Sequence, residues 1–193
     1  METIAIKKRN FEIVAPKGER SFITKYKDKL YFVKKFGEDF DGFKVYLRSL
    51  KRLDSTGINH TKLFAFDSQT RIVATQYIQG VTALDAMLKG DLPEIYFANI
   101  FKAAFFARKE KLYPNYDPVL WTLYKDKLYL LDPVCNQYME DEQFHFKGIF
   151  LWVYSNQFVN YLKEHKLEVD KSRLKTQGEI NKEVALKVVK YYI

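Results

Sequence analysis

One six-residue sequence occurs twice in this chain, and both copies have the pattern of a β-hairpin. Tyr-Lys-Asp-Lys-Leu-Tyr occupies residues 26–31 and again residues 124–129. In each copy a polar Lys-Asp-Lys segment separates two stretches rich in aromatic and aliphatic residues, which is typical of antiparallel strands joined by a tight turn. A Lys- and Tyr-rich chain can reach the same hairpin sequence twice by coincidence, so the residues that follow each copy are the informative ones. The first copy leads to Lys34, and the second leads to Asp132.

Length and composition indicate a globular protein with one domain or two small lobes. The chain has 193 residues, of which 47% are hydrophobic and 17% aromatic, enough to form a packed core. Its single cysteine, Cys135, excludes an intramolecular disulfide and a cysteine-cluster zinc site. The apolar windows are shorter than the ~20 residues that span a bilayer, and the N-terminus lacks the apolar stretch of a signal peptide. We therefore expect a cytoplasmic protein without a transmembrane segment.

The net charge of +8 is compatible with several anionic partners. Nucleic acid, an anionic membrane surface and a phosphorylated substrate would each suit it. The lysines are dispersed along the chain, however, and a solvated lysine-rich surface has the same composition. Nucleic-acid binding is therefore an alternative that we do not favour.

The first eighty residues have the alternation of an antiparallel sheet with one helix. The expected strands are residues 10–14, 21–26, 30–36, 62–66 and 71–78. The helix is indicated by an apolar stripe at helical spacing, formed by Phe43, Leu47, Leu50 and Leu53, and Asp41 is its expected N-cap.

After Gly80 the pattern becomes mainly helical. The expected helices are residues 82–88, 92–112, 143–163 and 180–193, and the second hairpin lies at residues 121–132. The chain therefore divides into residues 1–80, a sheet with one helix, and residues 81–193, a helical part with a hairpin.

This order of elements, with a charged residue at the end of each hairpin, resembles the protein-kinase-like superfamily. Small members such as RIO kinases, lipopolysaccharide-core kinases and aminoglycoside phosphotransferases are the most similar. Six segments within residues 11–157 carry the resemblance. Four are in the first part: a phosphate-covering turn at Gly18–Phe22, a third strand at Tyr31–Phe36, a turn after the helix at Gly57–Leu63 and a hinge strand at Val73–Gly80. Two are in the second part: a catalytic loop at Asn115–Asp117 and a strand that ends in an aspartate at Leu128–Asp132. The resemblance implies a small bilobal α+β fold with an antiparallel N-lobe sheet, one N-lobe helix and a mostly helical C-lobe.

The resemblance also implies a phosphotransferase that uses ATP and Mg²⁺ and has an alcohol group as acceptor. Lys34 would hold the nucleotide phosphates, Asp117 would position the acceptor hydroxyl and Asp132 would bind the metal. The other implied residues are a second metal ligand and nucleotide-binding positions: Thr122, Gly18, Gln76, Tyr77 and Ile78. The acceptor itself is not indicated by any residue.

Three departures from the family pattern leave other functions open. Thr122 stands where the family has a metal-binding asparagine, the turn at Gly18 has one glycine, and the first helix offers no glutamate to pair with Lys34, although Glu38 and Asp39 precede it. A catalytically degenerate, pseudokinase-like module that binds a nucleotide or a protein partner is therefore the second hypothesis, and a basic nucleic-acid-binding protein is the third. Strand alternation places Lys34 and Lys35 on opposite faces and does not say which of them faces the helix.

Overall fold

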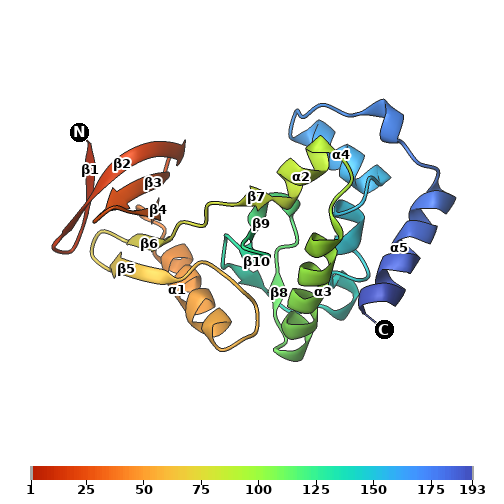
Figure 1. The fold of residues 1–193 in the computed structure, drawn as a ribbon. Helices are drawn as coiled ribbons and strands as arrows, with labels where there is room; N and C mark the ends of the chain where they lie inside the picture. Colours follow the sequence, from red (N-terminus) through yellow and green to blue (C-terminus); the bar gives the residue numbers. More distant parts are fainter. Residues whose placement is uncertain (1, 193) are drawn as a thin grey trace. The chain divides into compact units, whose positions relative to one another are not determined.

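The structure is a computed structural model that describes residues 2–192, and these residues form two compact units (Figure 1). Unit 1 consists of Met1–Ser55, His60–Gln79 and Asp132–Val134, and unit 2 of Thr56–Asn59, Gly80–Leu131 and Cys135–Ile193. Unit 1 is an antiparallel sheet with one α-helix, and unit 2 is mostly helical with two small sheets. The expected α+β class, with a sheet-rich first part and a helical second part, is confirmed.

The sheet of unit 1 has six antiparallel strands in the order β1-β2-β3-β4-β6-β5. The strands are β1 (Thr3–Ile6), β2 (Arg9–Gly18), β3 (Ser21–Tyr26), β4 (Lys29–Lys35), β5 (Leu63–Asp67) and β6 (Ile72–Gln76). The sequence pattern does not predict β1, because a four-residue strand offers only two inward positions, Ile4 and Ile6. Both side chains are buried, and pairing with β2 holds the strand in place.

Both copies of the repeated hexapeptide form the expected hairpin. Lys27 and Asp28 connect β3 to β4 with φ angles of 48° and 61°. In unit 2, Lys125 and Asp126 connect β9 (Trp121–Tyr124) to β10 (Lys127–Leu130) with φ angles of 49° and 60°. Positive φ at both central residues of a two-residue loop defines a type I′ turn, whose twist matches that of the flanking strands.

The helix of unit 1, α1 (Phe40–Asp54), covers one face of the sheet. Its buried side chains join those of the sheet in a cluster formed by Phe36, Phe43, Tyr46, Leu50 and Val73. The opposite face buries a second cluster formed by Ile4, Ile6, Phe11, Tyr31, Val33, Ala65, Ile72 and Ala74. The sheet therefore has an apolar core on each face.

The N-cap of α1 is Asp39, so the expectation that Asp41 caps the helix is wrong. The Asp39 carboxylate accepts a hydrogen bond from the Gly42 amide at 2.8 Å. Asp41 lies in the first turn instead, where a negative charge is also favourable. Two aspartates so close together are both plausible caps in the sequence, and only the backbone conformation distinguishes them.

Unit 2 contains four α-helices and several short elements. The helices are α2 (Ala83–Lys89), α3 (Glu94–Lys109), α4 (Asn156–Glu164) and α5 (Gln177–Tyr191). One sheet has the order β10-β9-β7 and the other pairs β11 with β8, where the short strands are β7 (Val81–Thr82), β8 (Tyr113–Pro114) and β11 (Cys135–Asn136). The 3₁₀ turns are η1 (Pro118–Leu120), η2 (Glu140–Glu142), η3 (Gly148–Leu151) and η4 (Lys171–Arg173).

The expectation of one helix over residues 143–163 is wrong for its first half. The segment before α4 contains only the two short 3₁₀ turns η2 and η3. The helix α4 begins after Ser155, whose hydroxyl accepts a hydrogen bond from the Phe158 amide at 3.2 Å. The segment before Ser155 buries Phe144, Ile149 and Trp152 completely. Residues 143–145 are buried in succession, Phe146 and Lys147 are exposed, and the next two residues are buried again. This order does not follow the 3.6-residue period of a surface helix.

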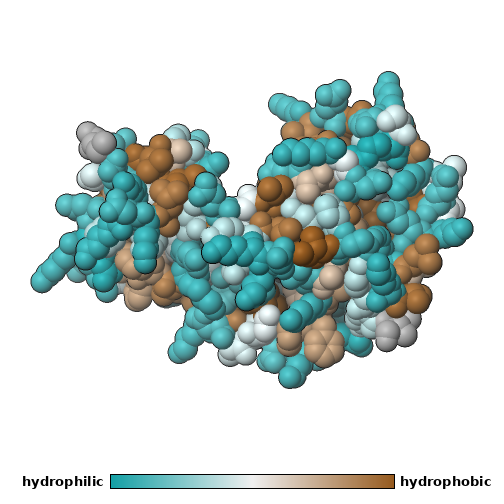
Figure 2. Space-filling model, in the orientation of Figure 1, coloured by the Kyte–Doolittle hydropathy of each residue, from teal (hydrophilic) through white to brown (hydrophobic). Residues whose placement is uncertain are grey.

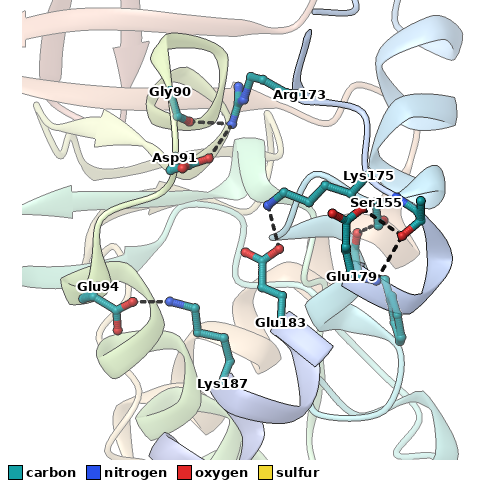
Figure 3. Close-up of polar contacts among 11 residues, drawn as sticks. Gly90, Asp91, Glu94, Ser155, Arg173, Lys175, Glu179, Glu183 and Lys187 are labelled. Carbon is teal, nitrogen blue, oxygen red and sulfur yellow. Dashed lines mark hydrogen bonds and ion pairs between the residues drawn. The ribbon is translucent and has the colours of Figure 1, made fainter. Parts of the chain in front are cut away.

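Arg173 and helix α5, near the C-terminus, make polar contacts with the rest of unit 2 (Figure 3). The Arg173 guanidinium donates to the Met87 carbonyl at 2.6 Å and to the Gly90 carbonyl at 2.8 Å. Glu94, in the first turn of α3, accepts hydrogen bonds from Lys187, Lys190 and Tyr191 of α5. These contacts join elements that are distant in the sequence.

Hydrophilic side chains cover most of the surface that Figure 2 shows, and the hydrophobic ones gather in smaller patches between them. None of the helices formed by residues 2–192 has the length and apolar character that crossing a bilayer requires. A groove of about 520 Å³ lies along α5 and is lined by side chains of both charges: Glu94, Lys175, Glu179, Lys182, Glu183, Leu186, Lys187 and Lys190.

Candidate functional site

Lys34 lies on β4 near the middle of the unit 1 sheet, and its side chain is on the face that α1 covers. In the sheet it is in register with Ser21 of β3 and Val73 of β6. Lys35 turns to the other face, where its ammonium lies 4.9 Å from the centroid of the Phe22 ring. The structure thus decides which of the two lysines faces the helix, a point that the sequence pattern leaves open.

The charges that follow the two hairpins meet in unit 1. The Lys34 ammonium lies 3.7 Å from the Asp132 carboxylate, and both side chains are about one-third exposed, at 31% and 36%. The other carboxylate oxygen of Asp132 accepts a hydrogen bond from the Val134 amide at 3.1 Å. Val134 packs against the cluster that contains Phe36 and Tyr46, and this packing anchors the Asp132–Val134 segment on the unit 1 core.

Two aromatic rings also face the Lys34 ammonium. The ring centroid of Tyr46 lies 5.1 Å from Lys34 Nζ, and that of Phe36 lies 5.4 Å away. Both distances are within the ~6 Å over which a ring face attracts a cation. Burial is the main reason why the pKa of the Tyr46 hydroxyl is raised, and the nearby Asp132 carboxylate raises it further. No sequence motif indicates Tyr46 as a partner of Lys34. The one signal is that this helix contains no glutamate that could pair with the lysine.

The residues implied to bind nucleotide lie at strand ends in unit 1. Gly18 ends β2 and is in register with Ser21, the first residue of β3. Gln76 ends β6 with an exposed side chain, the Tyr77 amide donates to the Leu30 carbonyl at 3.4 Å, and the Ile78 side chain is buried. The Gln76 amide also donates within the sheet, to the Lys62 carbonyl at 2.8 Å, and the side chain of Ile78 belongs to the core.

Asp117 lies in unit 2, where its carboxylate already has two donors. One of its oxygens accepts hydrogen bonds from the Val119 amide at 3.0 Å, which caps η1, and from the Tyr161 hydroxyl at 2.8 Å. Burial is the main reason why the pKa of Tyr161 is raised, and the contact with the Asp117 carboxylate raises it further. Tyr161 was not indicated by any sequence motif, because it is supplied by α4, far along the chain.

Thr122 is 1% exposed and lies on β9, in register with Thr82 and Tyr129. It belongs to unit 2, whereas Asp132 belongs to unit 1. Within residues 2–192, no three Asp, Glu, His or Cys side chains are arranged to hold a metal ion. Asp132 provides a single carboxylate, which suits Mg²⁺ because this ion keeps several waters and is usually bound through one or two carboxylates and the substrate's phosphates.

Comparison with protein-family models finds no match, and comparison with curated proteins finds none either. Among solved structures, the chain is similar to the crystal structure of a point mutant of the Mycobacterium tuberculosis PknI kinase domain, with a TM-score of 0.49 and 14% sequence identity. The alignment covers 70% of this chain and 64% of that chain. The chain therefore matches less than two thirds of that kinase domain's length.

Proposed function

We propose that this chain is a kinase-like phosphotransferase that uses ATP and Mg²⁺ to phosphorylate an alcohol group. The observation that carries the proposal is the pair formed by Lys34 and Asp132, whose charged groups are 3.7 Å apart and partly exposed. Phosphoryl transfer depends on positioning and on charge stabilisation, and an ammonium beside a metal-binding carboxylate supplies both kinds of contact.

In this proposal Lys34 binds phosphate oxygens as a point charge, and Asp132 binds Mg²⁺. The metal, when bound, would neutralise charge on the nucleotide phosphates. The turn after Gly18 would approach the phosphates through its backbone, and the segment Gln76–Ile78 would bind the adenine. Asp117 would orient the acceptor hydroxyl and accept its proton. Thr122, buried in β9, is the weakest of the proposed ligands.

A nucleotide-binding module without catalysis is the second candidate, and two observations favour it. Thr122 is buried, and one oxygen of the Asp117 carboxylate already accepts two hydrogen bonds. Such a module would use Lys34 and Asp132 for binding alone and would serve a protein partner. Such a module would bind nucleotide as the proposed enzyme does, but it would not hydrolyse or transfer the phosphate.

The first test is thermal unfolding of the purified protein with and without Mg-ATP, repeated for Lys34→Ala and Asp132→Asn. A ligand that binds only the folded state stabilises it by about 2.7 kcal/mol at a hundred times its dissociation constant. We expect the midpoint to rise in the parent and not in either variant. Lys35→Ala is the matched control, because Lys35 lies on the opposite face of the same strand, and it should keep the shift. Absence of a shift in the parent at millimolar Mg-ATP would overturn the nucleotide site.

Turnover separates the two candidates. We expect the parent to release ADP from Mg-ATP slowly without an acceptor, and Asp117→Asn to bind Mg-ATP normally while losing this activity. Binding without turnover in the parent would support the non-catalytic module. Binding of nucleic acid with an affinity that falls steeply with salt, and no binding of Mg-ATP, would support the third hypothesis.

A further inference from the structure

The Lys34 ammonium has two kinds of partner in unit 1. On one side is the Asp132 carboxylate, 3.7 Å away, and the aromatic partners are Tyr46 and Phe36, with ring centroids 5.1 and 5.4 Å away. The sequence of α1 contains no glutamate. The helix that packs beneath Lys34 therefore offers the ammonium a neutral ring and not a carboxylate.

Tyr46 is buried in this position. The residue is 1% exposed, and its ring packs against Phe36 with the centroids 5.4 Å apart and the planes inclined by 63°. A buried ring that packs against a neighbouring ring has few other orientations, so its face stays directed at the cation.

We propose that Tyr46 is a positioning residue for Lys34: the face of its ring holds the ammonium in place for an anionic ligand without neutralising its charge. The inference rests on the proposed function, because the phosphates of Mg-ATP are the ligand that it names.

A neutral partner for Lys34 has an advantage, because it leaves the charge of the ammonium unpaired when Asp132 binds a cation. Lys34 and Asp132 neutralise one another in the absence of ligand. When Asp132 binds a cation, its negative charge is engaged elsewhere, and Lys34 needs another contact to keep it from turning into solvent. A ring face supplies that contact and leaves the whole positive charge available to the phosphates, whereas a second carboxylate would compete with them.

The first experiment needs no nucleotide. In a double-mutant cycle, Lys34→Met and Tyr46→Met are made singly and together, and the unfolding equilibrium is measured in urea. We expect the two residues to be coupled by roughly two- to fivefold in the unfolding equilibrium constant, as for a partly exposed cation–ring contact. A cycle with Tyr46→Phe, which keeps the ring and loses only the hydroxyl, should show almost no change in the effect of Lys34→Met.

A spectroscopic measurement keeps the test valid if Tyr46→Met is too unstable for the cycle. Protons over a ring face resonate upfield, so the Lys34 Cε protons should be shifted upfield in the parent and in Tyr46→Phe. Phe36→Leu, which removes the other ring, should remove only part of the shift. Lys34 protons at the ordinary position in the parent would overturn the proposal, and so would an absence of coupling in the cycle.

The third experiment measures the affinity of the parent and the Tyr46 variants for Mg-ATP by titration. Tyr46→Phe should bind within about threefold of the parent, and Tyr46→Met should lose about tenfold or more. Equal affinity in all three proteins would overturn the positioning role. Coupling together with a parent that binds no Mg-ATP would overturn the proposed function and would leave Tyr46 as the partner of Lys34, so the two failures are distinguishable.

Discussion

In each of the two units, a tyrosine from a helix accompanies the charged residues that the sequence singles out. Tyr46 of α1 lies beside Lys34 and Asp132 in unit 1, and Tyr161 of α4 donates to Asp117 in unit 2. In both cases the tyrosine residue is buried and presents either its ring face or its hydroxyl to a partly exposed charge. An amphipathic side chain can do this because its body packs in the core while one polar feature faces outward.

At the scale of single residues, two glycines should respond differently to alanine. A Cβ on Gly80 would lie 2.2 Å from the Leu123 carbonyl oxygen, whereas a Cβ on Gly18 would have no atom within 4 Å. We expect Gly80→Ala to lower the free energy of unfolding by about 1–3 kcal/mol, because backbone must move to relieve the clash. Gly18→Ala should change it by less than about 0.5 kcal/mol. Urea unfolding of the two variants provides the comparison, and equal effects would contradict it.

Among the elements, both hairpin turns lack the Asn-Gly pair that the type I′ conformation favours most. The preferred residues at its two central positions are Asn and Gly, because both φ angles are positive. Here the positions are occupied by Lys and Asp in both copies. The strand residues next to the turn, a tyrosine before it and Lys-Leu-Tyr after it, are also the same in both copies and pair in the same register.

Replacing Lys125-Asp126 by Asn-Gly should therefore stabilise the protein. Relief of the positive-φ strain outweighs the added flexibility of glycine in the unfolded chain, and we expect a gain of about 0.5–1 kcal/mol in the free energy of unfolding. The hydrogen bond from Asn99 to the backbone carbonyl of residue 126 does not depend on the side chain. Lys125→Ala is the control, since alanine keeps a Cβ at the same φ. A loss of stability with Asn-Gly would show that the turn is not strained.

In the whole molecule, ion pairs and hydrogen bonds between Glu94 of α3 and residues of α5 hold the C-terminal helix against α3. Hydrogen bonds from Lys187, Tyr191 and Lys190 lower the pKa of the Glu94 carboxyl from 4.5 to about 2. The folded state therefore holds Glu94 ionised at pH values where the unfolded chain has already bound a proton. This contribution to stability is fully present above pH 4.5, and it is lost as the pH falls from there towards 2.

Glu94→Gln should lower the free energy of unfolding at neutral pH by roughly 1 kcal/mol, a value reduced for solvent screening because the Glu94 side chain is 52% exposed. The difference between the variant and the parent should shrink as the pH is lowered from 4.5 towards 2. Urea unfolding at about pH 7 and about pH 3 measures both quantities. Glu168→Gln, an exposed carboxylate on the segment before α5, is the matched control and should have no effect. A pH-independent difference would show that Glu94 acts by packing alone.

Most of the regular elements could be predicted from the sequence, because their patterns involve near neighbours. Both hairpins, the single helix of the first part and the long helix α3 follow from periodicities of two and 3.6 residues. The failures have specific causes. β1 is too short to show a pattern. Asp41 and Asp39 both have the side chain of a cap for α1, and only Asp39 has the position. In the aromatic segment before α4, burial does not follow a helical period.

Local patterns are enough to predict the two hairpins, the order of sheet and helices, and the lysine and aspartate that follow the hairpins. Packing between distant segments is what turns Lys34 and not Lys35 towards α1, brings Asp132 beside it and makes Tyr46 its neutral partner. Alternation and turns are set by adjacent residues, whereas the neighbours of a charge are set by packing between segments that are far apart in the chain.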